Sequence, residues 1–572
     1  MKKVKLFATI ASLCLAVAVL CFGVFSATNI TYTIGGTISY EVKDAFVKVN
    51  TKVYKGTNSY NRGELELVSE DFASGTKTLA SENFTQDTSY EISEYDSTSA
   101  STFAKNDMNF EFSSTTKSYV VEMDIKNLSS SVSVWAIAEW NIDDNSNIVQ
   151  GNNVMQKEIT STASKKIYFA VSVEDFRNSI SGVNYSMNLK IGVGDYSRSE
   201  ENLSKITIDS DNKVTPKDNI SGLVVIPEDC IVEPATYTEV MEQQVPISPF
   251  ATSGADTIVL PSTVESCLKM CVVGCQNVTR IVGVQTFGSD QMFYGQTGIF
   301  SARAKNLDGY TYAMCSNLQA VDMTNSGTTM GDMIFYECKS LRKIFIPKQL
   351  TGTVNSGAFV EAFEFLNCYN LEEIKVDDEN SVYTSKINGQ ECFGLYRKDD
   401  NVLLVGTINT IIPNGVKELA DGAFENRKGL KSLTLPSSIV TTGDEVFLGC
   451  EDITIKYTGT LEQWMSIAKS GSFCNSKIEL YIDNEMVKNI TDTMISNFVS
   501  IPRNALSCVN IESITIPVQI TTIGVCAFSN CQRLKTINYL GTKAQWNAIS
   551  KSTWWNSNCP SDMVIKCTDG NI

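Results

Sequence analysis

Three cysteines spaced by four residues form the first group in this sequence that could do chemistry. Cys267, Cys271 and Cys275 would share one face of a helix, where their thiolates could bind a metal ion. A structural zinc site takes four ligands, and no fourth ligand accompanies these three. Cys275 also falls at a position where cysteine recurs through the second half of the chain. We therefore expect no metal site and no cofactor.

Two clusters of oxygen-bearing side chains could hold calcium. Asp209 and Asp211 begin a segment like a calcium-binding loop, but the glycine of its turn is absent and Ile220 stands in place of the closing glutamate. The segment DDNSN at 143–147 offers oxygen atoms without such a loop. The first segment is predicted to be part of a solvated linker, and the second is predicted to be a turn.

The sequence has no histidine, which excludes several classes of enzyme. Ser–His–Asp and Cys–His nucleophile pairs, HExxH zinc sites and histidine proton shuttles all require it. A hydrolase that uses paired carboxylates needs only Asp and Glu, so this alternative survives. Because no pair of acidic residues stands out, we expect a protein that is not an enzyme.

A short repeat organises the second half of the chain. Cys508 and Cys531 are 23 residues apart, and Arg427 stands 23 residues before Cys450 at the same repeat position, which we call the slot. An apolar residue follows three positions after the slot, and two more usually follow at intervals of three and two. The last two alternate with polar residues, as on a β-strand. A fixed short period predicts a solenoid whose stacked turns share one core.

The repeat resembles the BspA-type leucine-rich repeat. The likeness rests on the strand L-x-x-I-x-I-P, the corner A-F-x-x-C and the 23-residue period, and it covers roughly residues 220–572. Residues 376–405 resemble the hairpin insertion of such arrays, and YTGTLEQWMSI (457–467) and YLGTKAQWNAI (539–549) resemble their closing modules. The resemblance implies adhesion to host or neighbouring-cell proteins, matrix proteins among them.

The first half of the chain follows a different pattern. Residues 28–200 contain no cysteine and include several segments that alternate apolar and polar residues. The apolar positions expected to share a core face are Tyr119, Val121, Met123 and Ile125; Ile167, Phe169, Val171 and Val173; and Val183, Tyr185, Met187, Leu189, Ile191 and Val193. Alternating strands between polar turns predict an antiparallel β-sandwich with one solvated face on each sheet.

The predicted fold class is therefore mainly β, with two domains. The sandwich at 28–200 is followed by a polar linker at 201–219 and a leucine-rich-repeat solenoid at 220–572. Each 23-residue turn is expected to hold one short strand and a helical or irregular return. The hairpin insertion is expected near 376–405, and the closing modules near 457–485 and 539–572.

Charge and the N-terminal segment limit the partners and the location. The net charge is −17 with no basic tract, so we expect no nucleic-acid partner. Residues 1–26 join a basic start to a long apolar run, which predicts a signal peptide, with an uncleaved anchor as the alternative. We expect a secreted or cell-surface protein that meets the membrane only through this segment, if it is uncleaved.

The cysteines beyond residue 26 all lie at or after Cys230. Those at the slot, such as Cys338, Cys508 and Cys531, are predicted to be reduced and buried as small apolar residues. Cys559 and Cys567 are the better candidates for a disulfide.

The outward positions of the repeat strands are the predicted ligand-binding surface, for an extracellular protein or glycan. They are Ala320 and Asp322, Lys343 and Phe345, Glu373 and Lys375, Ser432 and Thr434, Ser513 and Thr515, and Thr536 and Asn538, expected to form one ribbon along the stack. Trp554 and Trp555 are candidate aromatic contacts, whereas Trp464 and Trp546 are predicted to fill the core. The alternative function is a structural fibre or matrix component that assembles through the sandwich.

Overall fold

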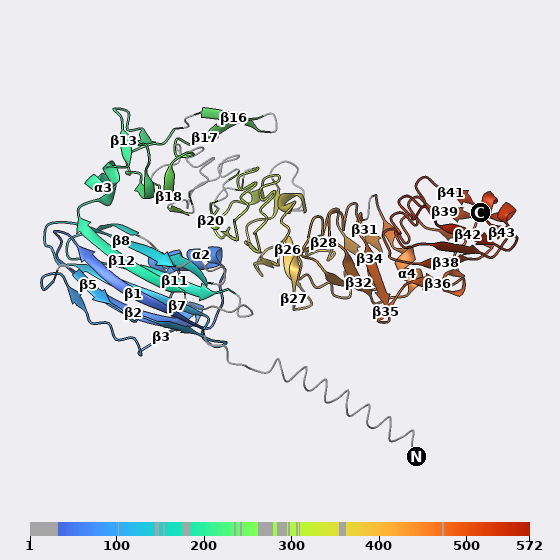
Figure 1. The fold of residues 1–572 in the computed structure, drawn as a ribbon, viewed down its shortest axis with the longest axis horizontal. Helices are drawn as coiled ribbons and strands as arrows, with labels where there is room; N and C mark the ends of the chain where they lie inside the picture. The colour runs from blue at the N-terminus through green and yellow to red at the C-terminus, as the bar shows by residue number, and fades with distance from the viewer. Residues whose placement is uncertain are drawn as a thin grey trace, which may run out of the picture. The chain divides into compact units, whose positions relative to one another are not determined.

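A computed structural model of the chain divides into two compact units, one ending at Glu201 and the other spanning Asn202–Ile572. Figure 1 shows the ribbon of both units, coloured by residue number from the N-terminus to the C-terminus. The structure describes residues 32–572 except 101, 143–147, 153–154, 175–182, 234–235, 241–242, 261–277, 279, 283–294, 296–297, 305–306, 308, 354–361 and 472–473. The predicted signal peptide, the DDNSN segment and Cys267, Cys271 and Cys275 lie outside the described residues. Within the described part of the chain, no helix is long and apolar enough to span a membrane.

The first unit is a sandwich of two six-stranded sheets. One sheet contains β1 (Tyr32–Val42), β5 (Thr102–Lys105), β6 (Phe110–Phe112), β8 (Val134–Ile142), β10 (Met155–Ile159) and β12 (Asn184–Val193). The other contains β2 (Val47–Gly56), β3 (Phe84–Gln86), β4 (Tyr95–Asp96), β7 (Ser118–Asn127), β9 (Ile148–Asn152) and β11 (Ser164–Val173). The predicted sandwich is thus confirmed as part of a mainly β chain.

The predicted core faces of β7, β11 and β12 are confirmed, with one exception. Residues of all three strands pack into one core between the sheets. Val193 is 43% exposed, because β12 ends there beyond the core. One strand pair departs from the predicted antiparallel arrangement: β1 and β12 run parallel, from Gly35 opposite Asn184 to Val42 opposite Ile191.

A helix covers the outer face of the second sheet, so the prediction of one solvated face on each sheet is wrong. Helix α2 (Arg62–Ser74) starts at Asn61, which caps the backbone N–H of Glu64, and ends at Gly75 with φ = 76°. Its apolar side chains pack on Val120 and Tyr168 of the sheet. The helix approaches β9 so closely that a Cβ on Gly151 would lie 2.3 Å from the carbonyl carbon of Leu65.

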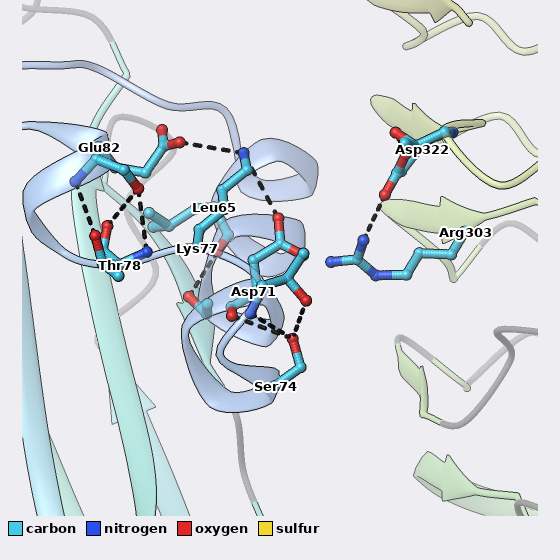
Figure 2. A network of polar contacts seen from close by, with 12 residues as sticks. Leu65, Asp71, Ser74, Lys77, Thr78, Glu82, Arg303 and Asp322 are labelled. Atoms are coloured by element: carbon cyan, nitrogen blue, oxygen red, sulfur yellow. Dashed lines mark hydrogen bonds and ion pairs between the residues drawn. The ribbon is translucent and has the colours of Figure 1, made fainter.

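Two ion pairs of Lys77 connect the chain just after this helix to its neighbours. Lys77 Nζ lies 3.5 Å from Asp71 of α2 and 3.2 Å from Glu82 of the 3₁₀ helix η1 (Ala80–Glu82). Figure 2 shows this network around Leu65 and Thr78.

The segment predicted as a polar linker is folded, so that prediction is wrong. Strands β13 (Ile206–Ile208) and β14 (Val214–Pro216) form a hairpin, and Ile206 and Val214 are 2% and 1% exposed in the core of the second unit. The short helix α3 (Glu200–Leu203) leads into it. The first of the two calcium candidates serves this hairpin: Asp209 Oδ1 accepts backbone N–H groups of Asp211 and Lys213, both at 2.9 Å.

The second unit is built mainly from short strands that pair in parallel from one turn of the chain to the next. The first part pairs β15 (Ser221–Val225), β18 (Gly254–Val259) and β19 (Arg280–Val282), beside the hairpin β16 (Thr236–Val240)–β17 (Gln243–Ile247). Beyond these strands lie three parallel ladders, which we call the first, second and third ladder. The first comprises β20 (Ser301–Arg303), β21 (Ala320–Asp322), β23 (Lys343–Ile346) and β25 (Glu373–Val376).

The second and third ladders each end in an antiparallel hairpin. The second comprises β30 (Ser432–Leu435), β32 (Ile453–Tyr457), β34 (Ile478–Ile482) and β35 (Glu485–Met486). The third comprises β36 (Asn489–Ile490), β38 (Ser513–Ile516), β40 (Thr536–Tyr539), β42 (Val564–Cys567) and β43 (Gly570–Asn571). Smaller parallel pairings accompany them: β22 (Thr329–Met330) with β24 (Gly352–Thr353), and β37 (Ser500–Ile501) with β39 (Thr522–Ile523) and β41 (Ser550–Lys551).

The predicted hairpin insertion separates the first ladder from the second. It consists of the antiparallel strands β26 (Tyr383–Ile387), β27 (Gln390–Arg397) and β28 (Leu403–Val405). Its sheet continues through β29 (Glu418–Leu419), β31 (Thr441–Thr442) and β33 (Ala468–Lys469), which run parallel to one another. The insertion is therefore joined to the repeat stack through β28 and β29.

The slot cysteines among the described residues form no disulfide, all but Cys559 are buried, and several form hydrogen bonds between turns. The thiols of Cys338, Cys450 and Cys531 donate to carbonyl oxygens of the preceding turn, each at 3.0 Å. Cys559 does the same at 3.2 Å, and neither it nor Cys567 forms a disulfide. The predicted Cys559–Cys567 pair is thus wrong, because Cys559 is the slot residue of the last turn.

Candidate functional site

In the first ladder, every second side chain of a strand points outward, as predicted. Ile344 and Ile346 of β23 and Ile374 of β25 are buried, whereas the side chains between them are partly or fully exposed. The register places Lys343 opposite Glu373 and Phe345 opposite Lys375. Two mixed rows of charged and aromatic side chains therefore lie on this face.

The predicted ribbon does not run unbroken along the stack, and this part of the prediction is wrong. The outward residues fall into separate sheets: Lys343, Phe345, Glu373 and Lys375 in the first ladder, Ser432 and Thr434 in the second, and Ser513, Thr515, Thr536 and Asn538 in the third. Ala320 is only 5% exposed, since its methyl group lies between the longer neighbours Ser301 and Lys343.

Sequence reasoning also missed several outward residues. The second ladder presents Thr454 and Lys456 of β32 and Glu479 and Tyr481 of β34, in register with Ser432 and Thr434. Arg303 of β20 forms an ion pair with Asp322 of β21 in the first ladder, as Figure 2 shows. The alternation of ITIKY at 453–457 was the available signal.

An open groove of about 570 Å³ lies where the first ladder meets the hairpin insertion. We call it the groove; it is lined by Phe345, Lys375, Val376, Asp377, Asp378, Glu379, Ser385, Lys386 and Glu391. Phe345 and Lys375 are two of the predicted contact residues, and the insertion supplies the opposite wall. The backbone N–H of Val376 donates to Ser385 Oγ at 3.1 Å, which holds that wall against β25.

The groove is charged, with four carboxylates against two ammonium groups among its lining residues. Lys386 Nζ lies 2.7 Å from Asp378 and 3.4 Å from Glu391, and Lys348 lies 2.8 Å from Glu379. The hydrogen bond between Lys386 and Asp378 lowers the pKa of the carboxyl group and raises the pKa of the amine. Both groups are therefore ionised at neutral pH, and the lining is net negative.

The tryptophans of the closing modules are mainly structural. Trp464 and Trp546 are 1% and 2% exposed, in agreement with the prediction that they fill the core. Trp555 is half-buried and packs edge-on against Trp546, at 6.1 Å between ring centroids, and its role as an aromatic contact stays a prediction. Trp554 is 68% exposed, because φ = 55° at this residue turns its side chain outward within a turn.

The two modules share one construction. Helices α4 (Leu461–Ser466) and α5 (Lys543–Ala548) each begin at a threonine that forms a capping box with a glutamine, Thr460 with Gln463 and Thr542 with Gln545. In each module a lysine amine lies over the tryptophan ring and donates to the tryptophan carbonyl oxygen. Lys469 does so at 2.7 Å and Lys551 at 2.6 Å. These modules therefore stabilise the fold.

The described residues include no cluster of three or more His, Cys, Asp or Glu side chains that could hold a metal ion. The groove offers charged groups, hydrogen-bonding groups and one aromatic side chain, Phe345.

Comparison with known proteins identifies the repeat. The family described as "BspA type Leucine rich repeat region" matches six copies, at residues 243–364, 291–393, 406–502 and 499–563. These matches span more than half of the chain, and the protein belongs to the BspA-type leucine-rich repeat family. No curated protein matches the chain.

Several solved structures of bacterial proteins are similar to this chain. A leucine-rich cell surface protein from Faecalibacterium prausnitzii is 19% identical, with 61% of this chain and 96% of that chain covered at a TM-score of 0.34. The pneumococcal vaccine antigen PcpA is 14% identical, with 64% and 91% covered at 0.34. A leucine-rich repeat protein from Eubacterium ventriosum is 19% identical, with 64% and 96% covered at 0.32.

Proposed function

We propose that this protein is a secreted or cell-surface binding protein, adhesin-like, that presents its repeat unit to an extracellular protein or glycan. The observation that carries the proposal is the groove, because it combines the outward residues Phe345 and Lys375 with the wall of the hairpin insertion. A volume of about 570 Å³ falls in the range of ligand-binding clefts. The leader-like N-terminal segment and family membership support a surface location.

The proposal assigns no catalysis to the chain. Asp378 and Glu379 are exposed, and each forms an ion pair with a lysine, Lys386 or Lys348, so neither lies in the buried environment that a general acid needs. Recognition then depends on complementary shape and charge over the groove and the first ladder.

An array of glycans and extracellular matrix proteins, probed with the whole chain, tests this proposal. We expect ligands whose signal is lost with Phe345→Ala/Lys375→Ala and kept with the matched pair Ser513→Ala/Thr515→Ala in the third ladder. Ligands lost only with Trp554→Ala would place the site in the last module. An array without any ligand would contradict the binding function, and filaments formed by the chain itself would then favour the fibre alternative.

A further inference from the structure

We infer that the groove binds an extended peptide segment rich in arginine or lysine, an inference that rests on the proposed binding function. Phe345 contributes an aromatic side chain from β23, and Asp377, Asp378 and Glu379 follow directly after β25. Glu391 adds a fourth carboxylate from the insertion. A guanidinium group can stack on an aromatic ring and bond a carboxylate through two N–H groups at once, so this combination suits arginine best.

The carboxylates are open to an incoming cation. The side chains of Asp378 and Glu379 are 74% and 72% exposed, although each has a lysine partner. Ion pairs between exposed side chains contribute little to stability. A guanidinium group from a ligand can therefore replace Lys386 or Lys348 as a partner at small cost.

Lys375 and Lys386 further restrict which ligands the groove can bind. Both line the groove among the carboxylates, so a compact cation such as a metal ion would be repelled by them. A peptide that spaces its cationic side chains with hydroxyl or backbone oxygen acceptors can satisfy both signs. The groove is also open, which allows a segment of a longer chain to lie through it.

The charge of the whole protein favours the same class of partner. The chain carries a net charge of −17, and a field of this sign draws cationic partners towards the surface. The field acts at long range and without selectivity, whereas the groove would fix the register of the peptide.

Fluorescence anisotropy with a labelled peptide of alternating serine and arginine tests the inference, with the citrulline version of the peptide as its neutral control. The whole chain is compared with Asp377→Asn/Glu379→Gln, in which asparagine keeps the Oδ1 acceptor that Asp377 offers to the N–H of Glu379. A matched pair, Glu512→Gln/Asp562→Asn, removes two exposed carboxylates outside the groove. Phe345→Leu tests the aromatic ring.

We expect saturable binding of the arginine peptide and none of the citrulline peptide. The groove pair should weaken binding about tenfold or more and Phe345→Leu about threefold, while the matched pair leaves affinity within about twofold. If the groove variant and the matched control variant lost the same affinity, the inference would be overturned, because the peptide would then be attracted by the overall charge of the protein. Absence of binding to the wild-type chain would also overturn it.

Failure of the inference can be separated from failure of the proposed function. A glycan or neutral protein on the array that needs Phe345, but not Asp377 and Glu379, would leave the groove as a binding site and refute only the cationic peptide. An array without ligands, together with no binding of the arginine peptide, would refute both.

Discussion

Phe345 and Lys375 lie directly opposite each other on neighbouring parallel strands, and both line the same groove. Phe345 belongs to β23, whereas Lys375 lies on β25, the last strand of the first ladder. The hairpin insertion follows β25 in the chain. Its residues form one wall of the groove, and the strands of the first ladder form the other. The binding proposal depends on this junction more than on the repeat itself.

The slot thiols should not react in the native protein. Burial raises the pKa of Cys338 and Cys531 well above the ordinary value, so the reactive thiolate is scarce as well as inaccessible. Thiol labelling without denaturant should leave both unmodified, whereas labelling in denaturant should modify them. Rapid native labelling of either cysteine would contradict the slot assignment.

Replacement of Cys531 should show that its hydrogen bond matters. Cys531→Ser keeps a donor for the carbonyl oxygen of Leu506, whereas Cys531→Ala removes the donor and leaves a cavity. We expect Cys531→Ala to lower the free energy of unfolding by about 1–3 kcal/mol, and Cys531→Ser to cost less. Denaturant unfolding measures both. A serine variant less stable than the alanine variant would show that the site acts only as an apolar contact.

Arg427 replaces the slot cysteine after the insertion and is completely buried. Its Nη1 donates to the carbonyl oxygen of Phe365 at 3.2 Å, three residues before the slot residue Cys368, and its Nε donates to Gly406 at 3.0 Å. The longer side chain thus makes the bond between turns that a thiol makes elsewhere.

Loss of the Arg427 donors should therefore destabilise the repeat unit. Arg427→Met keeps much of the volume and should cost about 1–3 kcal/mol from carbonyl groups left unsatisfied. Arg427→Ala adds a cavity and should cost more. Lys428→Ala, at the exposed neighbouring residue, is the control. Thermal unfolding in which Arg427→Met is as stable as the wild type would refute the bonding role.

Lys469 should make the stability of the repeat unit depend on pH. Burial lowers the pKa of Lys469 to about 7, whereas an unfolded lysine titrates at about 10.4. Between these values the unfolded chain holds more protons, so the free energy of unfolding rises with pH from about 7 to 10 and is lowest below pH 7.

A comparison with Lys469→Met isolates this effect. Between pH 6 and pH 9 the wild type should gain up to about 3 kcal/mol relative to the variant. The carbonyl oxygen and ring of Trp464 favour the charged amine and reduce the gain. Lys551→Met, at the less buried matching position, should show a smaller change. Parallel pH profiles for the wild type and Lys469→Met would contradict the prediction.

The folded hairpin at the start of the second unit sets the boundary for expression. A fragment of residues 202–572 should unfold cooperatively, whereas residues 220–572 should be less stable, because this deletion removes Ile206 and Val214 from the core. Thermal melts of the two fragments measure the difference. If the two fragments were equally stable, residues 202–219 would act as the linker that the sequence predicts.

The alternating strands and the repeat period were predictable from sequence, because both follow from which residues are apolar. Helix α2 also had a signal: Leu65, Val68 and Phe72 follow helical spacing after the cap at Asn61. The β13–β14 hairpin was hidden because its few apolar residues lie among polar ones, and burial of Ile206 and Val214 depends on distant contacts.

The breaks in the strand face could be predicted only in part. Asp483 and Asn484 adopt positive φ between β34 and β35, and the sequence Asp-Asn there is compatible with a tight hairpin turn. Whether such a hairpin ends a ladder depends on which strand pairs with which, and a single sequence does not reveal that. The groove was hidden for the same reason, since its walls meet only once the insertion packs on β25.

Hydrogen–deuterium exchange on the chain with its strongest array ligand tests the central claim most directly. We predict that ligand binding slows amide exchange in residues 343–346 and 373–391, which carry the groove, and leaves the third ladder at 513–516 and 536–539 unchanged. Protection confined to the sandwich, or to the turn around Trp554, would contradict the assignment of binding to the groove.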